Sequence, residues 1–172
     1  MNYDYEKGLN YALYLLSLQM KTVSQMEEKL ASKEMPPETI QKIIQFLIEH
    51  QFLDDANYAQ NYIRSRRHKY GDYRIKMELS RKGVSSADVS LGYQMISEEE
   101  GETEPSQEDA VRIVLDKKIA TINIDWDRLK SDYKYKYGIY QKLASFLAGR
   151  GFSSSVVKSA VSERLAENFI DE

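Results

Sequence analysis

The chain has 172 residues, 42% of them hydrophobic, no cysteine and a formal net charge of −3 at pH 7. This composition supplies a hydrophobic core and excludes a disulfide framework, so we expect an intracellular, cytoplasmic protein. No apolar run approaches the roughly 18 residues of a membrane span, and the start, MNYDYEKG, lacks the layout of a signal peptide, which predicts a soluble protein with no membrane partner.

The first fifty residues carry the pattern of short helices. Apolar side chains at helical spacing form one stripe over residues 9 to 20 and another over residues 40 to 47. Between the stripes, Thr22 followed by Gln25 has the form of a capping box, and MPPET supplies prolines that end one helix and begin the next. Neither stripe shows the alternation of a strand, so we expect helices throughout this segment.

A basic window follows at residues 64 to 83, with the sequence RSRRHKYGDYRIKMELSRKG. It holds eight of the 24 Lys and Arg residues and only two acids, which gives an acidic chain a local net charge of +6. The apolar spacing predicts that these bases lie along one side of two helices, with Tyr70 and Tyr73 among them as rings that could stack on nucleobases. The alternative is a solvated face without a partner. We predict that an anionic partner binds here. The predicted binding residues are Arg64, Arg66, Arg67, Lys69, Arg74, Lys76, Arg81 and Lys82.

An acidic segment, SEEEGETEPSQED at residues 97 to 109, holds seven acids and no base. It lacks large apolar residues and contains Gly101 and Pro105, which predicts a linker. Ser106, with Asp109 three residues later, is typical of a cap that begins a further helix. Downstream, the YKYKY sequence at residues 133 to 137 alternates as a strand does, but we interpret it as a loop or the start of a helix.

One helical frame occurs three times in the chain. It begins at Ala12, Ala59 and Ala110, each followed by large apolar residues and then by an apolar pair four residues apart. The third copy has about 17 extra residues between its first and second helices. A base lies three residues after each apolar pair, at Lys33, Lys82 and Arg150. We therefore predict an all-α fold of three tandem three-helix repeats, each resembling a helix-turn-helix unit, in an elongated arrangement.

This frame sets the predicted domain boundaries. The first repeat covers residues 1–53, and the second covers 54–97 with the basic face. An acidic linker covers 98–105, and the third repeat with its insertion covers 106–172.

No pattern in the sequence indicates catalysis. His50 and His68 lie in different repeats without an acidic partner at ligand spacing, which favours surface or helix-end positions. Asp54 and Asp55 resemble a carboxylate pair but are better placed to cap a helix that starts at Ala56. GRGF is too short to cradle a phosphate and follows no strand. We predict that the protein is not an enzyme and needs no metal or cofactor.

The segment FLDDANYAQNYIRSRRHKYGDYRIKMELSRKGVS resembles the central signature of the RecX family of bacterial recombination regulators. Weaker likeness extends over the flanking repeats, through QMEEKL and ASFLAGRGF. Departures from the family pattern occur in the first repeat, at Gln19, Gln25 and the Glu34-Met35 turn. The positions that carry the resemblance are Leu53, Asp54, Asp55, Tyr58, Ala59, Tyr62, Arg66, Gly71, Arg74, Ile75, Glu78, Leu79, Lys82 and Gly83.

The resemblance implies a regulatory protein of DNA recombination, DNA repair and the SOS response. RecX-like proteins bind the RecA recombinase filament on single-stranded DNA along its groove, restrain its ATP hydrolysis and strand exchange, and in many cases bind DNA directly. A monomer acting on this filament is the expectation. Two alternatives stay open: a stand-alone DNA- or RNA-binding helical module, and a helical protein adaptor without nucleic acid.

Overall fold

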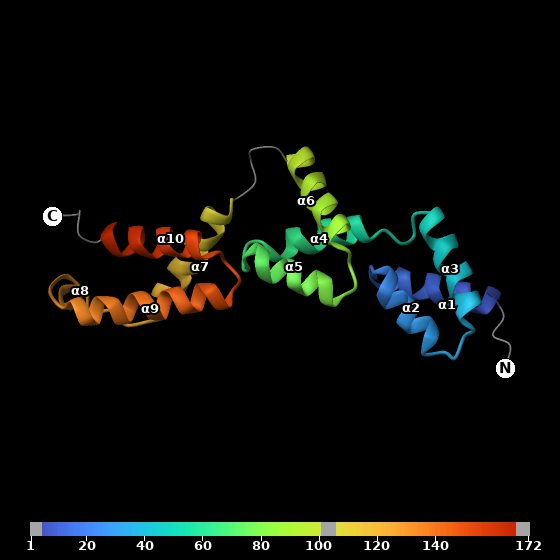
Figure 1. The fold of residues 1–172 in the computed structure, drawn as a ribbon, viewed down its shortest axis with the longest axis horizontal. Helices are drawn as coiled ribbons and strands as arrows, with labels where there is room; N and C mark the ends of the chain where they lie inside the picture. The colour runs from blue at the N-terminus through green and yellow to red at the C-terminus, as the bar shows by residue number, and fades with distance from the viewer. Residues whose placement is uncertain (1–4, 101–105, 168–172) are drawn as a thin grey trace. The chain divides into compact units, whose positions relative to one another are not determined.

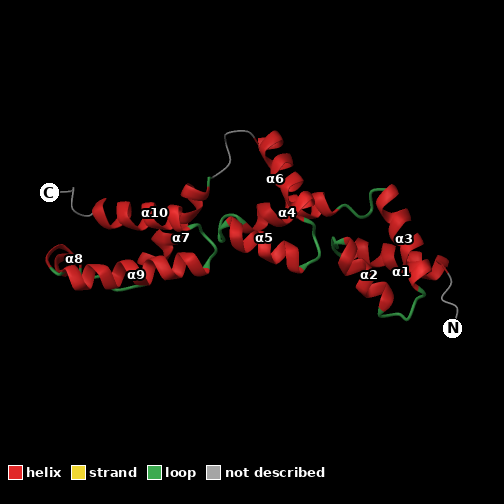
Figure 2. Cartoon of the chain, viewed as in Figure 1, coloured by secondary structure: helices red, strands yellow, loops and turns green. Residues whose placement is uncertain are grey.

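The computed structural model describes residues 5–100 and 106–167. In these two ranges the chain forms ten helices and no strand, which confirms the all-α prediction (Figures 1 and 2). The helices are α1 (Tyr5–Leu18), α2 (Val23–Ala31), α3 (Pro37–Glu49), α4 (Asp55–Arg66), α5 (Asp72–Arg81), α6 (Ser86–Glu100), α7 (Gln107–Ile119), α8 (Trp126–Ser131), α9 (Tyr133–Gly149) and α10 (Ser154–Glu167).

The helices pack into two compact units that divide the middle of the chain between them. The first unit contains α1 to α3, α4 as far as Ile63, α5 from Met77, and α6. The second contains residues 64–76 and helices α7 to α10. Helices α4 and α5 are therefore shared, and the turn between them belongs to the second unit.

The first unit contains a core made by α1, α2 and α3. Met26 and Leu30 of α2 and Ile43 and Leu47 of α3 have no exposed surface, and they surround Ala12 of α1. These residues follow the helical spacing of the predicted stripes. Met20 is an exception, since α1 ends at Leu18 and the Met20 side chain is 46% exposed.

The second unit has its own core between α7, α9 and α10, where α9 and α10 lie side by side (Figure 1). Leu143, Leu147 and Val161 are fully buried there. The extra residues of the third repeat form the additional helix α8, whose Leu129 joins this core, so the repeat has four helices instead of three. The YKYKY sequence is the first turn and a half of α9, begun by an Asp132 cap, and is not a strand.

Two predicted helix starts are confirmed as capping boxes. The Thr22 hydroxyl accepts from the Gln25 N–H, and the Gln25 side chain accepts from the Thr22 N–H. Ser106 and Asp109 form the same reciprocal pair at α7. Helix α6 continues to Glu100, three residues into the predicted acidic linker, and residues 101–105 lie outside the described ranges.

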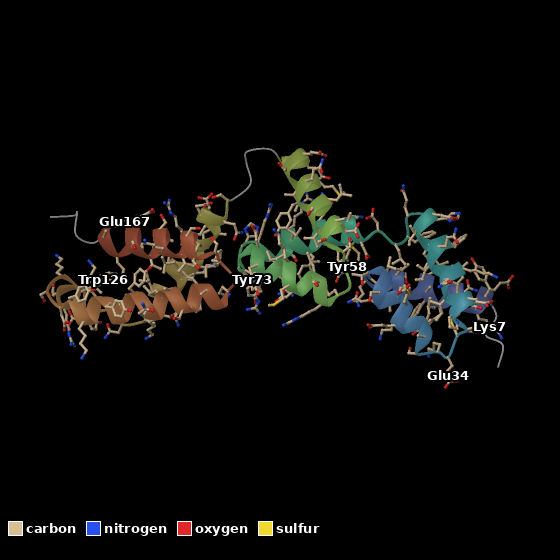
Figure 3. The ribbon with its side chains drawn as sticks, viewed as in Figure 1. Lys7, Glu34, Tyr58, Tyr73, Trp126 and Glu167 are labelled. Atoms are coloured by element: carbon tan, nitrogen blue, oxygen red, sulfur yellow. The ribbon has the colours of Figure 1, made fainter. Side chains whose placement is uncertain are left out.

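A turn with a left-handed backbone precedes the last helix of each repeat. Gly83 has a φ of 82° and Gly151 a φ of 85°, and each comes one residue after the repeated base. The equivalent residue of the first repeat is Glu34, an exposed side chain with a φ of 57° (Figure 3). This backbone region suits glycine and strains residues that have a Cβ.

The two glycine turns make the same kind of contact with the repeat before them. In the first unit, the Thr22 hydroxyl at the start of α2 donates to the Lys82 carbonyl at 2.7 Å. In the second unit, the Gly71 N–H at the start of α5 donates to the Arg150 carbonyl at 3.0 Å. Thr22 and Gly71 occupy the same place in the repeat frame, eight residues before a core leucine. Consecutive repeats are thus joined by a turn placed against a helix N-terminus.

Replacing Glu34 by glycine should stabilise the protein by about 0.5–1 kcal/mol, because a residue with a Cβ in the left-handed region is strained by about 1 kcal/mol or more. Urea unfolding followed by circular dichroism would measure the change.

Lys33→Gly is the matched control, since the preceding residue lacks a positive φ and should gain nothing from glycine. A loss of stability in Glu34→Gly equal to that of the control would show that the turn is not strained.

Candidate nucleic-acid interface

The basic window spans the end of α4, the following turn, the helix α5 and the two residues after it. Arg64 and Arg66 occupy the last turn of α4, where positive charge interacts favourably with the helix dipole. Six of the eight predicted residues, from Arg64 to Lys76, belong to the second unit, and Arg81 and Lys82 belong to the first. Six of the predicted bases therefore belong to one compact unit, and the other two belong to the unit formed by the first repeats.

Arg64 and Arg67 bring like charges together on partly buried side chains. Burial lowers the pKa of Arg67 from its usual value, and the positive charge of Arg64 lowers it further. Arginine still keeps its proton at neutral pH, so both charges persist.

Tyr70 is an aromatic contact for the arginines on both sides of the α4–α5 turn. The Arg74 Cζ lies 4.2 Å from the centre of the Tyr70 ring, and the Arg66 Cζ lies 5.8 Å from it. Cation–π contact of this kind holds a guanidinium in place without neutralising it. Tyr73 is 73% exposed at the start of α5 (Figure 3), so its ring is accessible to a nucleobase.

Arg81 and Lys82 have different surroundings within the first unit. The Lys82 Nζ lies 5.5 Å from the centre of the Tyr62 ring, and the Tyr62 hydroxyl donates to the Glu78 carboxylate at 2.6 Å. Arg81 is exposed, with its Nη2 3.8 Å from the Met77 sulfur. Lys82 also supplies the carbonyl that joins the first two repeats, so its backbone is structural while its charge faces an aromatic ring.

The two neighbouring aspartates cap two different helices. The Asp54 carboxylate accepts from the Asn57 N–H and caps its own helix, as predicted. Asp55 is already the first residue of α4, and its carboxylate accepts from the Val23 N–H of α2 at 2.9 Å. The prediction that both cap α4 is therefore wrong for Asp55, which joins the first two repeats instead. Burial raises the pKa of Asp55, and the nearby Asp88 carboxylate raises it further.

The two histidines lie at a helix end and in an exposed turn, the kinds of position that the sequence predicted for them. His50 follows α3, its ring stacks on Phe46 at 4.0 Å, and its Nδ1 lies 2.9 Å from the Phe46 carbonyl oxygen. His68 is exposed in the turn after α4.

Among the described residues no group of three or more His, Cys, Asp or Glu side chains is arranged to hold a metal ion. None of the helices in the described ranges is long and apolar enough to span a membrane.

A groove of about 360 Å³ with a mixed apolar and polar lining opens on the first unit. Leu13 and Leu16 of α1 line it together with Met20 and Phe52, which are 46% and 51% exposed. Sequence inspection missed this groove, because it assigned the stripe that ends at Met20 wholly to a helical core.

Tandem three-helix domains joined by glycine turns, with arginines gathered around one tyrosine, place the chain in the class of helical-repeat proteins. The family model for the first three-helix domain of RecX matches residues 9–47, and the model for the second matches residues 54–90. The regulatory protein RecX of Clostridium acetobutylicum is 33% identical over 168 residues, which cover 97% of this chain and 72% of that protein.

Other comparisons agree. The regulatory protein RecX of Clostridium perfringens strain 13 is 33% identical over 165 residues, covering 96% of this chain and 71% of the relative. The crystal structure of RecX from Lactobacillus salivarius superposes with a TM-score of 0.74 at 25% identity, covering 95% of this chain and 97% of that one. The chain belongs to the RecX family, as its central segment predicted.

Replacing Asp55 by two different residues should separate its capping role from its charge. Asp55→Ala should destabilise the protein by about 0.5–2 kcal/mol through loss of the cap on α2. Asp55→Asn keeps an oxygen acceptor without the charge, so it should be at least as stable as the wild type at pH 7.

The pH dependence follows from the raised pKa of Asp55. Because the folded protein then binds a proton more readily than the unfolded chain, the contribution of Asp55 to stability increases as the pH falls through the folded pKa toward the unfolded pKa. The advantage of Asp55→Asn should shrink over that window, measured by urea unfolding at each pH. Equal destabilisation by Asn and Ala at pH 7 would contradict this assignment.

Proposed function

We propose that this protein binds the RecA recombinase filament on single-stranded DNA and inhibits its ATP hydrolysis and strand exchange. Membership of the RecX family supports a regulatory role. The single observation that carries the contact is the gathering of arginines around Tyr70 at the α4–α5 turn. In this proposal the protein acts as a monomer in the cytoplasm, with the filament as its partner and without a cofactor.

The chemistry of the turn suits a surface made of protein and DNA. Guanidinium groups form charge-assisted, often bidentate hydrogen bonds with both carboxylates and phosphates. Arg66 and Arg74 are already oriented by the Tyr70 ring, so less side-chain freedom is lost when they bind. A protein held in this way along a filament would restrain the movements of neighbouring protomers on which ATP hydrolysis and strand exchange depend.

A helical adaptor without nucleic acid is the second candidate, and the apolar part of the groove on the first unit favours it. Exposed Met20 and Phe52 beside Leu13 and Leu16 form the kind of apolar surface that binds a protein segment. The two candidates differ in their dependence on salt, since apolar contact is weakened little by salt and phosphate contact strongly.

Replacing Arg66, Arg67, Arg74 and Arg81 together by alanine should abolish inhibition of the RecA ATPase on single-stranded DNA. The reason is the loss of charge-assisted bonds whose strength comes from counterion release, so the apparent affinity of the wild type should fall steeply as salt is raised. Steady-state ATP hydrolysis by RecA, measured over a range of inhibitor and salt concentrations, is the readout.

Lys29, Lys42, Lys142 and Lys158 replaced together by alanine provide a charge-matched control, because these four lysines are exposed and lie outside the window. The control should inhibit as the wild type does. Inhibition by the arginine variant equal to that of the control at every salt concentration, with helicity intact, would reject the window as the contact.

A further inference from the structure

We propose that the nucleic-acid site extends beyond the basic window into the third repeat, where Arg150 and Lys118 bind phosphates of a single-stranded backbone. The inference deepens the proposed function and rests on its nucleic-acid contact. It adds two binding residues that neither the sequence window nor the family comparison assigns, and it names the ligand group that each contacts.

Cations and aromatic rings alternate through this part of the second unit. The Arg150 Cζ lies 5.4 Å from the centre of the Tyr70 ring, on which Arg66 and Arg74 also converge. The same Arg150 Cζ lies 5.1 Å from the Phe146 ring, and the Lys118 Nζ lies 5.0 Å from that ring. The charges therefore continue from the α4–α5 turn through α9 to α7 as one connected row, which we call the cation–aromatic row.

The turn contact between the second and third repeats brings Arg150 into this row. Its carbonyl accepts from the Gly71 N–H at 3.0 Å, and its Nη1 donates to the Lys69 carbonyl at 3.4 Å. Reciprocally, the Arg74 Nη1 donates to the Gly149 carbonyl at 3.4 Å. Each of the two arginines thus donates to a backbone carbonyl of the other repeat. These bonds fix the guanidinium groups of Arg74 and Arg150 relative to the Tyr70 ring.

Ion pairing distinguishes these two bases from the arginines that stabilise the third repeat. Within the described ranges, Arg150 and Lys118 contact aromatic rings and form no ion pair with a carboxylate. An aromatic face leaves the charge of a cation intact, whereas a carboxylate cancels it. Their charge is therefore available to an external anion. The arginines that do form ion pairs in this repeat are Arg112 with Glu163, Arg128 with Asp132, and Arg164 with Asp116.

Phosphate is the ligand group that this arrangement recognises. A row of oriented cations follows successive phosphates, as in proteins that bind single strands through a charged track with aromatic side chains. Phe146, which lies between Arg150 and Lys118, has no hydrogen-bonding group, so its ring can stack on any base without reading a base edge. We therefore expect binding without sequence preference, with a strong dependence on salt.

The test is binding of the full-length protein alone to fluorescein-labelled oligothymidylate, followed by fluorescence anisotropy over a series of salt concentrations. The double variant Arg150→Gln with Lys118→Gln should bind more weakly. Its log–log salt slope should be shallower by roughly 1.4, since each single-strand phosphate contact contributes about 0.7. A mixed-sequence oligonucleotide should give the same result.

Two controls keep the test decisive. Arg112→Gln removes the same charge from an ion-paired position of the same repeat and should bind as the wild type does, and Arg150→Lys should restore most of the affinity lost in Arg150→Gln. If Arg150→Gln lowers helicity, Lys118→Gln alone serves, with an expected slope change of roughly 0.7.

Two outcomes would overturn the inference. One is a wild-type salt slope in the double variant, and the other is failure of the wild-type protein to bind the oligonucleotide at all. In the second case, a protein that still inhibits the RecA ATPase would keep the proposed function, with contact to RecA itself as its basis. Phosphate binding by the cation–aromatic row would then be rejected.

Discussion

Each pair of consecutive repeats meets at a left-handed turn, whose carbonyl accepts a hydrogen bond from the start of a helix in the preceding repeat. Gly83 and Gly151 provide the turns, and the carbonyls just before them accept from Thr22 and Gly71. A side chain on either glycine would meet the facing helix start, at Ser24 in one case and at Arg74 in the other. The contact thus needs glycine twice over, for its backbone angle and for its lack of a Cβ.

This contact also decides where the charges lie. The residue before each glycine is a base that lies near an aromatic ring, Lys82 near Tyr62 of its own repeat and Arg150 near Tyr70 of the repeat on which its turn docks. The same few atoms therefore join the repeats and orient cations. In the proposed anion site, stability and binding are coupled through Arg150, whose carbonyl joins two repeats and whose guanidinium lies over Tyr70.

Sequence reasoning succeeded where the interactions are local. The capping boxes at Thr22 and Ser106 span three residues, and helical periodicity identified the cores, so both could be read directly. It failed for Asp55, whose partner Val23 lies 32 residues away. The contact of Arg150 with Tyr70 was also missed, because the two residues are distant in the chain, although the repeat frame had already aligned Arg150 with Lys82. That alignment was the sequence signal that could have indicated Arg150 as a candidate binding residue.

The most direct test of this account uses a variant that alters the turn contact without changing any charge. The affinity of Gly151→Ala for single-stranded oligothymidylate should be measured by fluorescence anisotropy, with helicity followed by circular dichroism. The account predicts a loss on the order of tenfold, equivalent to about 1.4 kcal/mol, with the helices retained, because Arg150 no longer reaches the ring that orients it. Wild-type affinity in this variant would contradict the claim that docking of the turn builds the anion site.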